Sequence, residues 1–302
     1  MSRYEPRIDI SSVQAIDMHV HVERDHHGCL SLDQELMDAS AAYFRSSDNR
    51  TPTVADLAER YRAADMAAVV FTVDAATATG HPTLSSEDIA EQAAEHADVL
   101  IPFGSVDPHR GAAAIAQAQR LVGDHGVRGF KFHPSLQAFS PDEESFRPLW
   151  AALQELAVPV VFHTGQNGIG AGLPGGRGIK LKYSNPILLD EVAADFPGLE
   201  VILAHPSVPW QAEAIAMAVH KANVHIDLSG WAPRYFPAEL VRAAGGMLRH
   251  KVLFGSDYPL IAPERWIREF RELGLREEVL PGILKDNAVA LLGLAGAGEH
   301  SP

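Results

Sequence analysis

The sequence predicts an α/β protein and, within that class, a (β/α)8 TIM barrel. Eight short β-branched segments alternate with helical segments from about residue 13 onward, which is the pattern of repeated βα units and a parallel sheet. Eight such units in a chain of 302 residues match the size of a barrel. A doubly wound open sheet is the alternative, but no G-x-G-x-x-G turn follows the first expected strand.

The expected strands are short apolar runs, each with a polar residue or glycine near its end. They cover residues 13–22, 66–75, 99–106, 127–134, 158–165, 199–207, 223–230 and 251–259. Between them, apolar residues recur at helical spacing in 53–65, 85–98, 111–126, 143–157, 185–197, 210–222, 237–250 and 262–274. A further window, 276–293, predicts an extra C-terminal helix that closes one end of the barrel, and the tail 295–302 is expected to fray.

No linker composition divides the chain, so residues 1–302 are expected to form one barrel domain. Two of the expected βα connections, 23–52 and 166–185, exceed the roughly 2 to 6 residues usual in such units. Loops of this length at a barrel mouth are candidates for lids or substrate loops.

The composition excludes several classes of function. A formal net charge of -14 argues against general binding of nucleic acid or of an anionic membrane, since both need a basic surface. The single cysteine, Cys29, permits no internal disulfide, and the N-terminal residues lack an apolar signal segment. No apolar run approaches the roughly 18 residues of a membrane span. We therefore expect a cytoplasmic protein.

Polar side chains gather at the ends of the expected strands. His19 and His21 are two residues apart in AIDMHVHV, so both imidazoles point to one side of the strand, which in a closed barrel can be the interior. Barrel enzymes place their chemistry at this C-terminal mouth. Equivalent strand ends carry Lys131, His133, His163, His205, Asp227 and Asp257.

A single such residue is more often a core histidine whose hydrogen bonds are all made within the protein, or a helix cap. The H-x-H pair together with His163 and Asp257 instead favours a divalent metal bound by three imidazoles and one carboxylate. Zinc, manganese or iron would suit this donor set. Such an ion lowers the pKa of bound water to about 7, and a histidine such as His205 can then transfer the proton.

The motifs DMHVH, GFKFHP, FHTG, LAHP and LFGSDYP resemble the amidohydrolase superfamily over nearly the whole chain. They resemble in particular amidohydrolase-related family 2, the branch of aminocarboxymuconate-semialdehyde decarboxylase and γ-resorcylate decarboxylase. The resemblance implies a barrel of the metal-dependent hydrolase type with one divalent metal, usually zinc. It also implies His19, His21, His163 and Asp257 as ligands and His205 as the acid/base.

Within that branch, HTGQNGIGAGLPGGRGIKLKYSNP and ILAHPSVPWQ resemble a subgroup of hydrolases named for 4-hydroxyphenyl-β-ketoacyl-CoA. This predicts hydrolysis, in which metal-activated water attacks a carbonyl of a small anionic substrate from an aromatic pathway, with C–C cleavage of an aryl β-ketoacyl-CoA. The alternative is non-oxidative decarboxylation of an aromatic or enoic acid, with His205 or Asp257 handling the proton. A non-catalytic metal-binding barrel is a further alternative.

The remaining candidates are substrate contacts. Lys131 and His133 could contact substrate or the ligands; a carboxylated Lys131 bridging two metals is a less favoured reading. Trp231 and Arg234 would place an aromatic ring and a cation at the mouth, although Trp231 could equally be core packing. The loop residues Arg177, Lys180 and Lys182 suit a substrate carboxylate or the phosphates of CoA, with a solvated rim as the alternative. Because dimers are common in the resembling family, a homodimer is expected.

Overall fold

The structure is a computed structural model that describes residues 3–44 and 51–294. The tail predicted to fray and part of the first long loop lie outside these ranges. Eight parallel strands are present, as the sequence predicts, although most are shorter than expected. They are β1 Ala15–His21, β2 Met66–Phe71, β3 Leu100–Pro102, β4 Phe130–Phe132, β5 Val160–His163, β6 Val201–Ala204, β7 Val224–Asp227 and β8 Val252–Leu253.

The strands follow one another in chain order around an α/β barrel. The ladders form a three-stranded sheet, β1-β2-β3, and a five-stranded sheet, β4 to β8. Parallel bridges link the two sheets at both seams, between Gly104 and Phe130 and between Val20 and Tyr258. At the second seam, the Asp257 amide also donates to the His19 carbonyl over 3.0 Å. These bonds place the end of β8 beside the end of β1.

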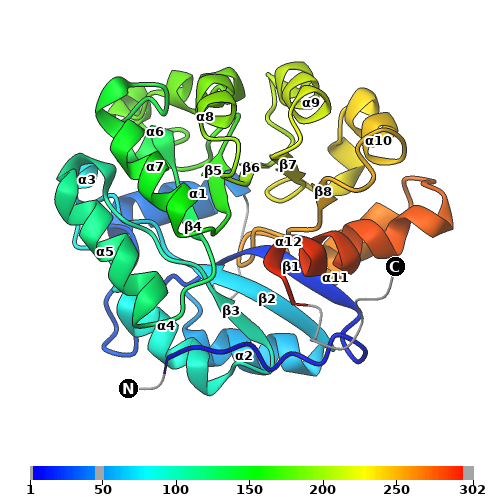
Figure 1. The fold of residues 1–302 in the computed structure, drawn as a ribbon, viewed down its shortest axis with the longest axis horizontal. Coiled ribbons are helices and arrows are strands. Elements are labelled where there is room, and N and C mark those ends of the chain that lie inside the picture. Colours follow the sequence, from blue (N-terminus) through cyan, green and yellow to red (C-terminus); the bar gives the residue numbers. More distant parts are fainter. Residues whose placement is uncertain (1–2, 45–50, 295–302) are drawn as a thin grey trace.

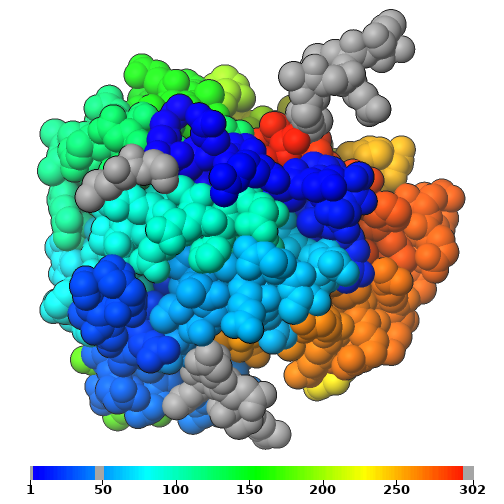
Figure 2. Space-filling model, turned by 90° about the horizontal axis from the view of Figure 1, so that it is seen from below, coloured from blue at the N-terminus to red at the C-terminus, as the bar shows by residue number. Residues whose placement is uncertain are grey.

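Helices surround the strands (Figure 1). Each of the first eight helical windows contains a helix near the expected position: α2 Val54–Ala63, α4 Ser86–Glu95, α5 Ala112–Gly123, α7 Arg147–Glu155, α8 Asp190–Asp195, α9 Gln211–His220, α10 Ala238–Ala244 and α11 Pro263–Arg271. Figure 2 shows α2 (light blue) beside α11 (orange), where Arg60 and Glu264 form an ion pair of 2.7 Å. In the described part of the chain, no helix combines the length and the apolar character that crossing a bilayer requires.

The hydrophobic core has two layers. The inner layer fills the barrel and includes Ile16, Met18 and Val69, whereas the outer layer lies between strands and helices. The ninth window contains a π-helical turn, Gly282–Asp286, and α12 Asn287–Leu292. Ala288 and Leu292 of α12 pack against the inner layer. The prediction of an extra C-terminal helix that closes one end of the barrel is confirmed.

An irregularity in β1 decides where its histidines point. Asp17 pairs with Ala68 and Val20 with Val70, so three steps on β1 match two on β2. Strict alternation from the inward-facing Met18 would turn His19 outward. A bulge of this kind re-aims side chains, and both histidine rings instead lie 5.0 Å from the ring of Phe71, an inner-layer residue.

Three features differ from the sequence-based expectation. The first long loop contains a helix, α1 Gln34–Phe44, which the pattern did not predict. Two short helices, α3 Ala76–Thr79 and α6 Pro134–Gln137, follow β2 and β4. The helix expected over 237–250 ends at Ala244, because Gly245 and Gly246 lower helix propensity there.

Trp150 of α7 is fully buried and its indole N–H donates to the Pro141 carbonyl over 3.0 Å. Replacing it with alanine removes the largest side chain of this part of the core. We expect Trp150→Ala to lower the free energy of unfolding by about 3–5 kcal/mol in denaturant titrations. Met247→Ala, at a residue 72% exposed, is the control and should change it by less than about 0.5 kcal/mol. Equal effects of both variants would contradict this view of the core.

Candidate functional site

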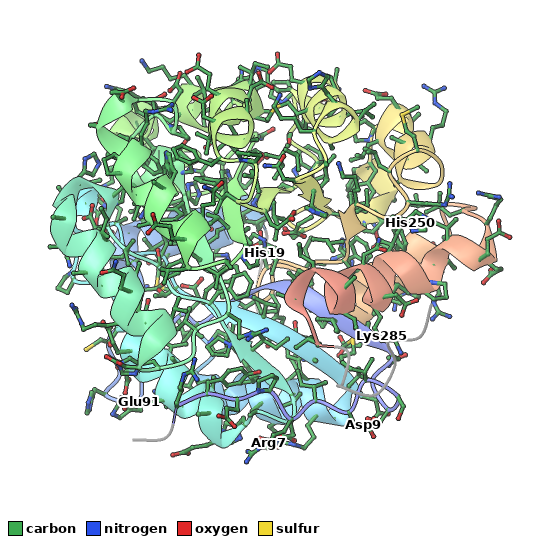
Figure 3. All side chains as sticks on the ribbon, viewed as in Figure 1. Arg7, Asp9, His19, Glu91, His250 and Lys285 are labelled. Carbon is green, nitrogen blue, oxygen red and sulfur yellow. The ribbon has the colours of Figure 1, made fainter. Side chains whose placement is uncertain are left out.

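The centre of the site is a group of three metal-ligating side chains at the seam between β1 and β8. His19 and His21 come from β1 and Asp257 from the segment after β8. One ligand atom from each lies within 4.8 Å of the others. Figure 3 places His19 in the interior of the fold. Two imidazoles and a carboxylate at this separation are a suitable donor set for a divalent ion.

Asp227, at the end of β7, sets the proton position on His19. Its Oδ2 lies 2.5 Å from His19 Nδ1. Burial lowers the pKa of His19 well below its usual value, so the ring is neutral. Because Nδ1 then donates its proton to the carboxylate, Nε2 carries no proton and its lone pair can accept. That nitrogen lies 3.4 Å from Asp257 Oδ1, on the side where a metal would bind.

Lys131, from β4, shows that this space attracts cations. Its ammonium donates to His19 Nε2 over 3.1 Å, although the side chain is only 1% exposed. Burial lowers the pKa of Lys131 to about 8, while the charges of Asp257 and Asp227 oppose that shift. The charges of the two carboxylates therefore favour a cation at this place, although burial outweighs them for Lys131.

Asp257 is the anionic donor of the group. Burial alone would raise its pKa, but a hydrogen bond from His21 and the neighbouring positive charge lower it to about 2. His21 Nε2 lies 3.2 Å from its Oδ1. Glu23 Oε1 lies 3.7 Å from the other ring nitrogen of His21, and burial raises the pKa of Glu23. Glu23 thus continues the line of inward-facing side chains from β1.

His163, the fourth predicted ligand, ends β5 beside the three-residue group. Its Nε2 is buried and makes no hydrogen bond with any described residue, while Nδ1 lies 2.8 Å from His205 Nε2. Its ring stacks on His133 with 3.8 Å between centroids. A buried imidazole with an unused nitrogen is costly. A metal bound through a ring nitrogen of His163 would use this spare capacity, so the residues present fit a divalent ion.

His205 is held in place by its neighbours. Its Nδ1 lies 3.0 Å from Ser229 Oγ, which also donates to Asp227 over 2.9 Å. Burial lowers the pKa of His205 to about 4, so the ring is neutral near pH 7. A Cβ on Gly230 would lie 2.4 Å from His205 Nδ1, which explains the glycine there.

The backbone at two of these positions is strained. His205 has φ 74° and Asp257 has φ 66°, both in the left-handed region. Such conformations cost of order 1–3 kcal/mol for a residue with a side chain, and they concentrate at functional sites. Both residues are the candidates for proton transfer predicted from the sequence.

A cavity of about 750 Å³ opens onto this group. Its wall includes His21, Lys131, His133, His163, His205, Trp231, Arg234 and Asp257, all predicted from the sequence as site residues. Residues from both long loops also line it, among them Tyr43 and Phe44 of the first loop and Asn167 and Ile169 of the second. The two loops therefore form part of the cavity wall.

The three loop cations lie elsewhere. Arg177 pairs with Asp33 over 2.5 Å and with Glu35 over 3.2 Å, so its charge ties the second long loop to the region of α1. Lys180 and Lys182 lie over the ring of Tyr183. None of the three lines the cavity that the described residues form. Their predicted contact with substrate stays a prediction.

Sequence reasoning missed several residues of the site. Glu23 shares the parity of His19 and His21, so the alternation H-V-H-V-E carried a signal for it. Arg265, in the first turn of α11, lines the cavity without any sequence signal, because helix periodicity does not mark a residue at a barrel mouth. Ser229 follows Asp227 by two residues and joins the same hydrogen-bond network.

We expect Asp227→Asn to weaken metal binding. Asparagine has a similar shape, but it carries no charge to fix the proton on Nδ1 of His19. Loss of such a supporting partner typically costs 10- to 100-fold in metal affinity. Competition between the protein and a chelator for zinc measures this affinity, with Asp98→Asn at an exposed surface pair as the control. Unchanged affinity in a folded Asp227→Asn protein would contradict the assigned role.

Comparisons with known proteins agree with this geometry. The sequence matches the amidohydrolase family Amidohydro_2 over residues 16–294. None of the curated proteins that were compared matches the chain. Among solved structures, an uncharacterised TIM-barrel protein from Bordetella bronchiseptica is 24% identical, with a TM-score of 0.76 over 92% of this chain and 98% of that one.

Two further structures are decarboxylases. A 2,6-dihydroxybenzoate decarboxylase from Rhizobium is 16% identical, with a TM-score of 0.68 over 94% of this chain and 100% of that one. A dihydroxybenzoic acid decarboxylase from Polaromonas, with bound manganese, is 18% identical, with a TM-score of 0.64 over 93% of this chain and 97% of that one. At these identities the structures share the fold. Together with the match to the family, the barrel and its histidine and aspartate group lead to one conclusion: the chain belongs to the amidohydrolase family and is a metal-dependent enzyme.

Proposed function

We propose that the protein catalyses non-oxidative decarboxylation of a hydroxylated aromatic acid at one divalent metal. The observation that carries this proposal is the group of His19, His21 and Asp257 at one cavity, with the neutral imidazole of His205 beside it. The two decarboxylases of similar fold support the same reading. The sequence predicted hydrolysis, with decarboxylation as the alternative, and the similarity to decarboxylases favours the alternative.

In this proposal His19, His21, His163 and Asp257 hold the metal, which supplies positive charge that orients and polarises substrate oxygens. Zinc is the ion predicted from the sequence, and manganese is equally compatible with imidazole and carboxylate donors. The manganese in the Polaromonas decarboxylase supports testing both ions.

Lys131 and His133 would bind substrate oxygens. The neutral ring of His133 accepts a hydrogen bond from the Leu136 amide at Nδ1, over 3.2 Å, so its proton is on Nε2. His133 and the ammonium of Lys131 thus contribute two donors from neighbouring positions on one cavity wall. Donors fixed in this way stabilise negative charge on a substrate oxygen as it develops.

His205 would transfer the proton. As a neutral base it takes the proton of a ring hydroxyl and returns it to the ring carbon that bears the carboxylate. The bond from that carbon to the carboxylate then breaks, and its electron pair restores the aromatic ring as CO2 leaves. The products are a phenolate and CO2, so the proton and the electrons balance without water. The bond between His205 Nδ1 and Ser229 would keep the ring in place during both transfers.

Hydrolysis remains the rival because the same donors could activate water. The reactions differ in whether water enters the product. We expect protein loaded with manganese or zinc to release CO2 from 2,6-dihydroxybenzoate or a related hydroxybenzoate, with no oxygen from ¹⁸O-labelled water in the aromatic product. Mass spectrometry of the product together with CO2 detection makes this measurement.

The His205→Gln variant tests whether His205 is the proton carrier. Loss of the proton carrier should lower kcat by about 10²–10⁴-fold while metal content is unchanged. Incorporation of labelled oxygen into a new carboxylate, for example from 4-hydroxybenzoylacetyl-CoA, would show hydrolysis and overturn decarboxylation. Full activity of His205→Gln would remove His205 from the mechanism.

A further inference from the structure

Two arginines line the cavity from the segments that follow β7 and β8. Arg234 lies in the short 3-10 turn Pro233–Tyr235, and Arg265 lies in the first turn of α11. Both line the cavity and both contact the same oxygen, Oε1 of Glu269, over 3.3 and 2.9 Å. Two guanidinium groups therefore converge on one carboxylate.

This cluster carries surplus positive charge and unused hydrogen-bonding capacity. Glu269 is only 7% exposed, whereas the side chains of Arg234 and Arg265 are 54% and 44% exposed. One carboxylate cannot satisfy the ten N–H groups of two guanidinium ions. Glu269 Oε2 is buried and makes no hydrogen bond with any described residue, so the cluster is not a closed ion pair that serves stability alone. Paired guanidinium groups bind carboxylate and phosphate well because they offer several donors in a plane.

The cavity thus has positive charge in two places. Lys131, beside the histidines and Asp257, is the positive charge near the metal donors. Arg234 and Arg265 are the second positively charged part of the wall. Much of the remaining wall is apolar, formed by Leu32, Phe44, Val73, Leu136, Ile169, Ala232, Leu260 and Ile261. This arrangement matches a ligand with an apolar body and two anionic groups, one for Lys131 and the metal donors and one for the arginine cluster.

We propose that the substrate is doubly anionic and that Arg234 and Arg265 bind the anionic group that does not react. The inference rests on the proposed function for the identity of the reacting group, a carboxylate held near the metal donors. The second group is an anionic oxygen group, either a carboxylate or a phosphate. Arg265 and Arg234 thereby determine specificity for dianions over monoanions.

Binding measurements on the metal-loaded protein test this directly. The probes are benzoate with one anionic group, isophthalate and terephthalate with two carboxylates, and 4-carboxyphenyl phosphate, with affinities measured by calorimetry. We expect at least one dianion to bind about tenfold or more tightly than benzoate. Preference for the phosphate or for a dicarboxylate identifies the second group. The advantage should shrink as salt concentration rises, because the guanidinium groups are partly exposed.

The double variant Arg234→Gln with Arg265→Gln should remove this advantage and leave the affinity for benzoate within about twofold. The control is Arg268→Gln, which removes the same charge from an exposed position on the same helix and should retain the advantage. Arg234→Lys with Arg265→Lys keeps the charge, so it should retain part of the advantage, and it replaces the first variant if that one does not fold.

Three results would overturn the proposal: no dianion advantage in the unmodified protein, an advantage that survives loss of both charges, or equal weakening of benzoate and the dianions. These outcomes are separate from the fate of the proposed reaction. If the arginine-dependent advantage is found but no carboxylate releases CO2, decarboxylation fails while the doubly anionic ligand stands. If CO2 is released without such an advantage, decarboxylation stands and the doubly anionic ligand is rejected.

Discussion

The short hydrogen bond between His19 Nδ1 and Asp227 is the interaction on which the site depends. It joins strands β1 and β7 across the barrel interior and determines which nitrogen of His19 carries the proton. The same carboxylate accepts from Ser229, whose hydroxyl also contacts His205. One buried anion therefore orients a metal ligand and holds the candidate proton carrier. Burial raises the pKa of Asp227 to about 7, while the hydrogen bonds from Ser229 and the charge of Lys131 oppose that rise and favour the ionised form.

The fold is adjusted locally to keep this arrangement. The bulge in β1 turns His19 and His21 into the barrel, and backbone bonds across the seam place Asp257 beside them. Glycine occupies position 255, where a Cβ would lie 2.1 Å from Asp227 Oδ1. The left-handed backbone of His205 and Asp257 is a cost that the packed barrel around them offsets. Precision at the site thus comes from irregularities on a regular barrel.

The sequence predicted the barrel because nearly every βα unit shows both patterns: a short apolar segment for the strand and apolar residues at helical spacing for the helix. It also predicted the histidines, Lys131 and Asp257 of the cavity wall, since residues at strand ends must meet at one mouth. It could not predict α1, because the helical spacing is weak there, or the cluster of Arg234, Arg265 and Glu269. Arg265 and Glu269 are four residues apart on α11, but Arg234 comes from the turn after β7, and only tertiary packing brings it to them. Arg177 is the opposite case, a predicted substrate contact that does not line the cavity. It forms ion pairs with Asp33 and Glu35 instead.

Anomalous diffraction at the zinc edge, from crystals of the zinc-loaded protein, tests the central claim most directly. The account predicts one strong peak about 2.0–2.2 Å from His19 Nε2, His21 Nε2, Asp257 Oδ1 and a ring nitrogen of His163, with His19 Nδ1 still bonded to Asp227. The ammonium of Lys131 should have moved away from His19 Nε2, which then binds the ion. A peak at another place, or a zinc ion bound through His19 Nδ1 with the Asp227 contact broken, would contradict it.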